Sequence, residues 1–379
     1  MEFVIERLPL LNSLGMVQGI VERRNTVPIL GHVLFEPAGE HLRLAATDLE
    51  VGIRTEVPCR QGQSGTLTLN ARKLFEIVRE AEGEEVAFKS LEGDWFELKC
   101  GRARFKMMGL DPRSFPAMPS QSARSTDEPM RKAVKAEIKI PAAVLAAMID
   151  KTLFAVSPDE ARYNLSGVFI EAPGNDQVRM VATDGHRLSM IDREVSGFSM
   201  QGGVIIPRKG LKELRKLLDQ AGDGQTELML DGQLASLRHG RTEVSMRLVE
   251  GEFPDYRGVI PQGSRYQIGV KRGLLLAAIK RAAIFANERY HGLKLGFAEG
   301  VLTVSSTSPE LGEASETIDV DFSGEEFSIG FNAAYLLEVL NVIDSEDEVV
   351  LGVSDEVSPG VITTNTDSQF TYVVMPMRL

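Results

Sequence analysis

The residues of this chain that could do chemistry gather in the hexapeptide Thr183 to Leu188, TDGHRL. Asp184 could orient His186 in an acid/base pair. It could also join Asp48 and Glu50 as carboxylate ligands of nuclease metal ions. Both interpretations lack the residues they need, because the five histidines have no metal-ligand spacing and no GxxxxGK[ST], GxSxG or HExxH motif occurs. The sequence therefore predicts a protein that is not an enzyme and uses no cofactor or metal.

A turn explains the same residues more simply. VRMVATD, residues 178–184, alternates apolar and polar side chains as a strand does, and Asp184-Gly185 is a common turn signal. ATDLE at Ala46 echoes ATDGH at Ala182, so the aspartates recur at equivalent places. That repetition favours a turn role over a metal site.

The composition is that of an ordinary globular protein, with 379 residues, 43% hydrophobic and 25% charged. This length is too great for one compact core, so two or three domains are expected. No apolar run approaches the roughly 20 residues of a membrane-spanning helix, and residues 1–11, MEFVIERLPLL, lack a signal-peptide pattern. We expect a cytoplasmic protein with no membrane partner. Cys59 and Cys100 are expected to be reduced thiols.

One pattern of helices and strands occurs three times. Alternating, strand-like segments follow each of six expected amphipathic helices, at 8–24, 70–80, 141–156, 207–218, 271–289 and 331–343. A period near 130 residues predicts three copies of one unit. The expected fold class is α+β, with two helices and antiparallel sheets in each unit. Asn70 is the expected N-cap of the second helix.

The repeat also sets the expected domains. They span residues 1–121, 138–257 and 258–379. Residues 122–137 are expected to form a solvated linker, because the stretch from Ser120 is rich in Ser, Pro and charge and has no periodicity. FPAMP at Phe115 and FPDY at Phe253 mark the ends of the first two units.

The net charge of −12 argues against nucleic acid, but the distribution of charge does not. The six expected helices together carry +9 and the remaining residues −21. Basic helices in an acidic chain suggest one face that meets a polyanion. The alternative is a solvated helix face made of Arg208, Lys209, Lys212, Arg215 and Lys216. Because no base-reading motif occurs, any contact with DNA is expected to be to its backbone and independent of sequence.

Several long motifs, in order along nearly the whole chain, resemble the β sliding clamp family of bacterial DNA polymerase III. They are TVPILGHVLFE (26–36), ATDLE (46–50), LNARKLFEIVR (69–79), RYNLSGVFIE (162–171), VATDGHRL (181–188), VIIPRKG (204–210), LVEGEFPDYRGVIP (248–261), IGFNAAYLLEVLN (329–341) and YVVMPMRL (372–379). The resemblance implies three repeated DNA-clamp domains per chain and a head-to-tail homodimer, a ring with helices inside that encircles double-stranded DNA. It implies a processivity factor that docks the replicative polymerase alpha subunit, the clamp loader delta subunit, and other polymerases and repair proteins through short linear motifs.

The resemblance further implies a protein-docking cleft between the second and third domains. Its residues here would be Leu165, Thr183, Gly185, His186, Arg187, Leu188, Pro254, Val259, Tyr290, Asn332, Tyr335, Val357, Val373, Val374, Met375, Pro376, Met377, Arg378 and Leu379. Aliphatic and Met side chains suit an adaptable apolar pocket, with Tyr and Arg orienting the peptide at its rim. Gly258 stands where the family commonly has Arg, and Pro359 where a small polar residue is usual, which bears on partner preference at that edge.

Two more surfaces follow from the resemblance. Ring closure would use an apolar centre with opposite charges around it, from Lys73, Arg102, Arg104, Phe105 and Met107 of the first domain and Ile284, Phe285, Glu310, Glu313 and Glu316 of the third. DNA would meet Arg24, Arg72, Lys73, Tyr163, Arg208 and Lys209. Asn164 replaces a Tyr often found beside Tyr163. A competing hypothesis is an acidic scaffold that binds peptides and never DNA.

Overall fold

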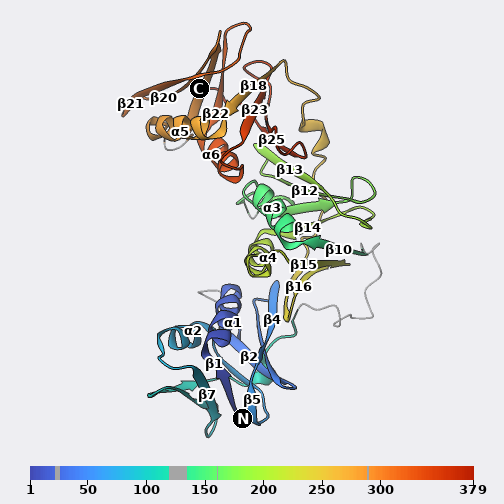
Figure 1. Ribbon diagram of the computed structural model, residues 1–379, viewed down its shortest axis with the longest axis vertical. Helices are drawn as coiled ribbons and strands as arrows, with labels where there is room; N and C mark the ends of the chain where they lie inside the picture. The colour runs from blue at the N-terminus through green and yellow to red at the C-terminus, as the bar shows by residue number, and fades with distance from the viewer. Residues whose placement is uncertain (22–25, 119–134, 160, 288–289) are drawn as a thin grey trace. The chain divides into compact units, whose positions relative to one another are not determined.

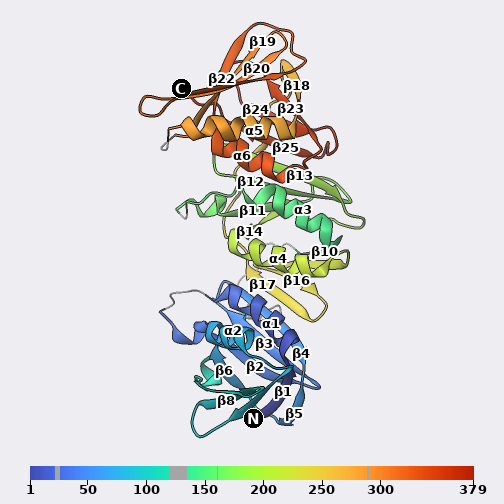
Figure 2. The ribbon, with the colours of Figure 1, turned by 60° about the vertical axis from the view of Figure 1, so that its left-hand side comes forward.

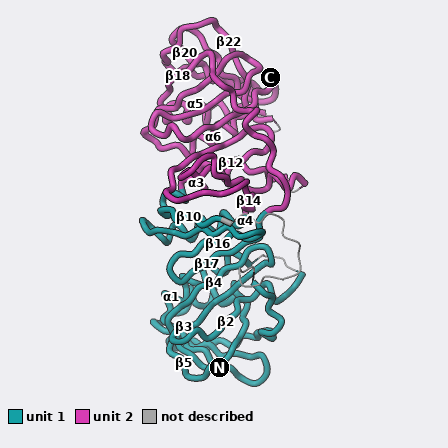
Figure 3. Tube along the Cα trace, turned by 90° about the vertical axis from the view of Figure 1, so that its right-hand side faces the viewer, with its two compact units in different colours: residues 1–146, 209–248 teal, residues 147–208, 249–379 magenta. Residues whose placement is uncertain are grey.

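The computed structural model describes residues 1–21, 26–118, 135–159, 161–287 and 290–379 (Figure 1). They form two compact units: unit 1 has residues 1–146 and 209–248, and unit 2 has residues 147–208 and 249–379 (Figure 3). The three predicted domain boundaries stay a prediction, and most of the predicted linker at 122–137 lies outside the described residues. None of the described helices is long and apolar enough to cross a membrane.

Unit 1 contains two antiparallel sheets. The five-stranded sheet has the order β5 (Arg60–Gln63), β1 (Glu2–Glu6), β7 (Glu85–Ser90), β8 (Trp95–Cys100), β9 (Ala103–Met108). The eight-stranded sheet has the order β10 (Lys135–Pro141), β15 (Gln225–Asp231), β16 (Leu234–His239), β17 (Thr242–Arg247), β4 (Val51–Pro58), β3 (His41–Thr47), β2 (His32–Ala38), β6 (Leu67–Asn70). α1 (Arg7–Ile20) packs beside α2 (Ala71–Glu80), as Figure 2 shows. All of α4 (Arg208–Ala221) except its first residue belongs to this unit.

Unit 2 is built in the same way. Its eight-stranded sheet has the order β14 (Gly203–Pro207), β11 (Gly167–Glu171), β12 (Gln177–Thr183), β13 (Arg187–Glu194), β25 (Phe370–Val374), β24 (Gly360–Thr364), β23 (Glu348–Val353), β18 (Tyr266–Lys271). Its four-stranded sheet has the order β21 (Gly312–Asp319), β20 (Val301–Ser308), β19 (Gly292–Ala298), β22 (Phe327–Asn332). α5 (Arg272–Ala282) packs beside α6 (Ala333–Val342), and α3 (Ala142–Leu153) begins in unit 1 and ends in unit 2. The predicted α+β class is confirmed.

All six predicted helices occur among the described residues. Asn70 caps α2 as predicted, because its Oδ1 accepts the backbone N–H of Lys73 at 3.0 Å. Residues 22–24 of the first expected helix lie outside the described residues. The helix expected at 271–289 is too long, since α5 gives way to a 3-10 turn, η5 (Ala283–Phe285), and the backbone of Ala286 is extended. The apolar periodicity continues past the helix end, and the side chain of Ile284 is 70% exposed.

Two strand pairs join one repeat to the next, and they share one register. β4 pairs with β17, with Val51 opposite Met246. β13 pairs with β25, with Arg187 opposite Val374. Val51 and Arg187 each lie three residues after the aspartate of the repeated ATD sequence, so the two junctions align residue for residue. The corresponding strands of the first and third repeats, β9 and β21, lie at the edges of their sheets.

Candidate functional site

The Thr183 to Leu188 hexapeptide forms the turn between β12 and β13. Asp184 Oδ1 accepts the backbone N–H groups of His186 at 2.9 Å and Arg187 at 3.1 Å, and Gly185 has a φ of +89°. Asp48 closes the equivalent turn in the first repeat, where its Oδ1 accepts two backbone N–H groups at 3.0 and 2.7 Å. The turn interpretation is confirmed. The Asp184 carboxylate is committed to backbone groups and to Arg187, and the structure gives it no bond to the His186 ring.

Arg187 connects this turn to the neighbouring elements of unit 2. Its side chain is only 7% exposed. The guanidinium donates to Asp184 Oδ2 at 3.1 Å and to the Phe154 carbonyl at 2.8 Å, and it is ion-paired with Glu338 of α6. It also lies 4.4 Å from the centroid of the Tyr335 ring. A buried guanidinium with this many partners is fixed in place. Arg187 therefore positions neighbouring groups, and its side chain is not an exposed group at the rim of the predicted cleft.

Leu188 and Val373 are opposite each other in the β13–β25 pair and are 2% exposed. They form a buried cluster with Tyr256, which belongs to the connector between the second and third repeats. The Tyr256 hydroxyl donates to Glu171, and it accepts from Arg179 Nη1 at 3.2 Å. Burial raises the pKa of the Tyr256 hydroxyl, and the bond to Glu171 raises it further. The connector is thereby anchored over the two strands.

The same connector carries Pro254 and Val259, which flank the anchored Tyr256. Phe253 stacks on Phe169 of β11 with ring centroids 4.9 Å apart. Val259 lies in the 3-10 turn η4 (Arg257–Val259), and its side chain is 38% exposed. Gly258, in the same turn, is exposed and would leave open space around an added Cβ. The missing Arg at this position therefore removes a side chain from an accessible surface.

The end of the chain, residues 375–379, runs past the turn and past β22. The Met375 N–H donates to the His186 carbonyl at 2.9 Å, and the Met377 N–H donates to the Gly330 carbonyl at 2.8 Å. The side chain of Leu379 is 67% exposed. We call Met375 to Leu379 the C-terminal segment. It links the turn before β13 to β22, the strand that leads into α6.

Two more predicted residues, Asn332 and Tyr335, lie at the start of α6. Asn332 Oδ1 accepts the Ala334 N–H at 2.9 Å and so caps the helix. The Tyr335 ring stacks on the His186 ring with centroids 6.5 Å apart. We call this surface of unit 2, from His186 across the C-terminal segment to Tyr335, together with Pro254 and Val259, the docking surface.

Three predicted residues have hydrogen bonds to nearby parts of the chain. Leu165 is 8% exposed, and its carbonyl accepts the Ser157 N–H at 3.0 Å. Tyr290 is 61% exposed, and its N–H donates to the Asn287 carbonyl at 3.2 Å. Val357 is 66% exposed in a loop closed by an aspartate. The docking role of these residues, like that of the docking surface as a whole, stays a prediction.

Of the residues predicted to meet DNA, Arg24 lies outside the described residues. Tyr163, in the 3-10 turn η3 (Tyr163–Leu165), is 59% exposed. The other cations have partners within the chain: Arg72 donates to the Val21 carbonyl at 3.3 Å, Lys73 pairs with Glu76 at 2.7 Å, and Lys209 pairs with Asp48. Arg208 is half-buried, and its buried Nε has no hydrogen-bond partner among the described residues.

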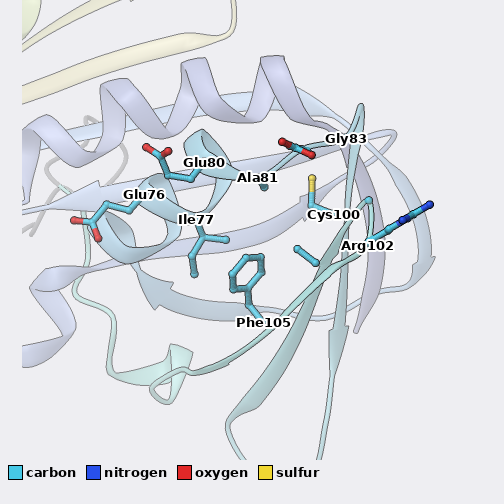
Figure 4. Close-up of a pocket in the computed structure, with 11 residues that line it drawn as sticks. Glu76, Ile77, Glu80, Ala81, Gly83, Cys100, Arg102 and Phe105 are labelled. Carbon is cyan, nitrogen blue, oxygen red and sulfur yellow. The ribbon is translucent and has the colours of Figure 1, made fainter.

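Two of the predicted ring-closure residues of unit 1, Arg102 and Phe105, line a groove of about 840 Å³. Figure 4 shows Ile77 contributed by α2 and Phe105 by β9, with Arg102 at the β8–β9 turn. Cys100 is 2% exposed at the groove, and burial raises the pKa of its thiol. Ile77 also lines the groove but was not among the predicted residues, although it lies four residues after Lys73 and so on the same face of α2.

The predicted ring-closure residues of unit 2 lie on η5 and at the β20–β21 hairpin. Ile284 is 70% exposed. A Cβ added at Gly312 would lie 3.8 Å from the Phe285 ring. Glu316 accepts Arg281 Nε at 2.7 Å, and this hydrogen bond lowers the pKa of the glutamate. Leu311, which the sequence prediction missed, is 60% exposed at the hairpin turn.

Comparisons with known proteins agree over the full length. Profiles described as the N-terminal, central and C-terminal domains of the DNA polymerase III beta subunit match residues 1–119, 139–255 and 257–378. The beta sliding clamp of Proteus mirabilis is 37% identical over 382 residues, with 100% of both chains covered. The crystal structure of DNA polymerase III subunit beta from Pseudomonas aeruginosa has a TM-score of 0.90 and 35% identity, with 100% of both chains covered. A Bartonella birtlesii sliding clamp, bound to griselimycin, has a TM-score of 0.91 and 32% identity over 100% of both chains.

Beside the docking surface, Asp367 ties three elements together. It accepts Lys151 Nζ of α3 and Arg193 Nη2 of β13, each at 2.6 Å, from the loop that leads into β25. Burial acts to raise the pKa of Asp367, but the hydrogen bonds from Arg193 and Lys151 outweigh it and hold the pKa below its usual value. A carboxyl group of this kind stabilises the fold above its unfolded pKa, near 4, and the stabilisation is lost as the pH falls through the lower, folded value.

Asp367→Asn should therefore lower the free energy of unfolding by about 1–3 kcal/mol at pH 7, because two partly buried cations lose their counter-charge. The variant should also lose less stability than the parent between pH 5 and the acid limit. Urea unfolding at pH 7, 5 and 3 measures both effects, with the exposed Asp344→Asn as the control. Parallel pH profiles for parent and Asp367→Asn would contradict the assignment.

Proposed function

We propose how this chain, which belongs to the β sliding clamp (DNA polymerase III β subunit) family, carries out its function as a processivity factor of DNA replication. Two copies pair head to tail through β9 and β21 into a ring around duplex DNA, and the docking surface receives the proteins that act there. One observation carries the proposal: the β4–β17 and β13–β25 pairs share a register, and β9 and β21 are the corresponding strands left at sheet edges.

The first half of the proposed register comes from β9. Cys100 pairs with Ala103 across the β8–β9 turn, as the corresponding residues do across the β16–β17 turn. By this alignment Met107 corresponds to Met246 of β17. Met107 is therefore the residue that would face the first residue of an incoming strand equivalent to β4.

The second half comes from β21. Val301 pairs with Asp319, as the first residue of β12 pairs with the last residue of β13. By this alignment Gly312 corresponds to Arg187, with one extra residue in the β20–β21 turn. Gly312 of one copy would therefore lie opposite Met107 of the other.

The register derived in this way makes the edges complementary. It sets these residues opposite each other: Gly312 and Met107, Glu313 and Lys106, Ala314 and Phe105, Ser315 and Arg104, Glu316 and Ala103. Opposite charges across a strand pair each contribute about 0.2–1 kcal/mol. Leu311 and Met108, which are 60% and 61% exposed in the single chain, would come side by side. The groove lined by Ile77 and Phe105 would receive Ile284 and Phe285 of the second copy.

The helices supply the attraction for DNA. A ring holds a duplex by topology, so its cations need only bind phosphates weakly and without sequence preference. This agrees with the internal pairing of Lys73 and Lys209, whose charges are already partly balanced. Arg208 and the exposed Tyr163 are the described candidates for direct contact.

Docking is assigned to the β13–β25 junction because of the side chains that meet there. Leu188 lies opposite Val373, whereas the corresponding pair at the β4–β17 junction is Gly52 and Ser245. At the proposed β9–β21 junction the corresponding pair is charged. An apolar floor with an accessible segment above it suits short motifs rich in Gln, Leu and Phe from polymerases, the clamp loader and repair proteins.

Lys106→Glu and Glu313→Lys should each weaken the dimer, because each places like charges opposite one another. The double variant should recover most of the loss. Sedimentation of a dilution series measures the dimer affinity, with Lys89→Glu on β7 as a control away from the edge. Double reversal that dimerises no better than either single variant would refute the register.

Removing the C-terminal segment, Met375 to Leu379, should weaken binding of a labelled peptide rich in Gln, Leu and Phe by at least about tenfold, or 1.4 kcal/mol. The dimer should persist, since the segment bonds to β22, which lies at the opposite edge of the four-stranded sheet from β21. Fluorescence anisotropy measures the affinity, with Leu8→Ala on α1 as the control. Unchanged affinity in the shortened chain would rule out this docking surface.

A further inference from the structure

The C-terminal segment lies against a strand edge that no other strand of the described residues covers. β22 ends the four-stranded sheet, next to β19. The Met377 N–H donates to the Gly330 carbonyl of β22, and the Met375 N–H donates to the His186 carbonyl. Two backbone bonds thus fix the path of the segment, at its first and third residues. What lies beneath the remaining residues then decides how closely the segment can approach.

Two glycines lie beneath it. A Cβ at Gly330 would be 2.4 Å from the Met377 carbonyl oxygen and 2.8 Å from Leu379 Cγ. A Cβ at Gly292, on the neighbouring strand β19, would be 2.4 Å from Leu379 Cδ2. Neither glycine has a positive φ, so the backbone does not require glycine at these positions. Glycine is required there because a side chain would occupy the space of the C-terminal segment.

Comparison of the three repeats shows that glycine beneath the returning segment is particular to the third repeat. In each repeat a backbone N–H that follows the last strand returns to the strand that precedes the second helix. The donor lies two residues after the last strand in the first and second repeats, and three residues after it in the third, where it is Met377. Val249 donates to the Ile205 carbonyl at 2.9 Å, and Leu110 donates to Thr68 Oγ1 at 3.0 Å. Ile205 and Thr68 occupy the place of Gly330, and both carry side chains. Only in the third repeat, where the returning segment belongs to the docking surface, does glycine stand there.

We propose that Gly330 and Gly292 are positioning residues of the docking surface: they seat the C-terminal segment and thereby set the affinity for partner peptides without touching them. The proposal rests on the docking function proposed above. Asn332, which lies opposite Gly292, joins the seat to the cap of α6. Any side chain at position 330 would lift the segment from the strand edge.

Gly330→Ala should raise backbone hydrogen exchange in residues 375–379 and weaken binding of the Gln-, Leu- and Phe-rich peptide about tenfold or more, the scale of an overpacked contact. Gly292→Ala should act in the same direction but more weakly, because it meets only the flexible end of Leu379. Gly296→Ala on β19 is the matched control, since its Cβ would meet Thr303 at an ordinary 3.7 Å.

A shortened chain distinguishes displacement of the C-terminal segment from a general loss of stability. All three atoms nearest to a Cβ at Gly330 belong to Met377 and Leu379. Gly330→Ala should therefore lower the thermal midpoint of the full chain and leave that of a chain ending at Pro376 unchanged. Equal destabilisation of both chains would overturn the proposal, as would unchanged exchange and affinity in the full-length variant. If the parent fails to bind the peptide, the docking proposal fails, and the exchange data still decide whether the glycines seat the segment.

Discussion

An unpaired strand edge is the constraint on which this structure depends. Its backbone N–H and C=O groups bind another strand when they are left uncovered. Within the chain, β4 pairs with β17 and β13 pairs with β25, and the C-terminal segment bonds to β22. β9 and β21 stay at the edges of their sheets. In the proposed ring, the rule that joins one repeat to the next inside the chain would also join β9 to β21 of a second copy.

The docking surface is a modified junction. Both connectors between repeats pack a large buried side chain against their sheet, Met118 of FPAMP in the first case and Tyr256 of FPDY in the second, each with the phenylalanine of the same motif beside it. Tyr256 adds a buried hydroxyl bonded to Glu171, which fixes the connector while the following turn stays accessible. Beneath it the apolar pair replaces the small residues of the β4–β17 junction. On the proposed docking role, a few substitutions on a shared frame would thus turn a structural junction into a binding surface.

The parts of the structure that are local in sequence could be predicted from it. Helix positions, the cap at Asn70 and the turn at Asp184 follow from side chains within a few residues of one another. The continuity of the sheets across repeats could not be predicted, because β4 and β17 lie far apart in sequence. Strands with the same alternation of apolar and polar residues can pair with many other strands. The burial of Arg187 and the seat at Gly330 also escaped prediction, since both depend on neighbours from other elements. The end of α5 was missed because exposed apolar residues continue its periodicity past Ala282.

Retention on DNA tests the central claim, closure of two copies into a ring, most directly. The protein is loaded onto nicked circular plasmid by a bacterial clamp loader of proven activity on its own clamp, and gel filtration follows dissociation before and after the plasmid is linearised. A ring predicts persistence on the circle at moderate salt and loss from the linear form, because only free ends let a topologically held protein slide off. Equal loss from both forms would contradict the account and favour an acidic scaffold that binds peptides but not DNA.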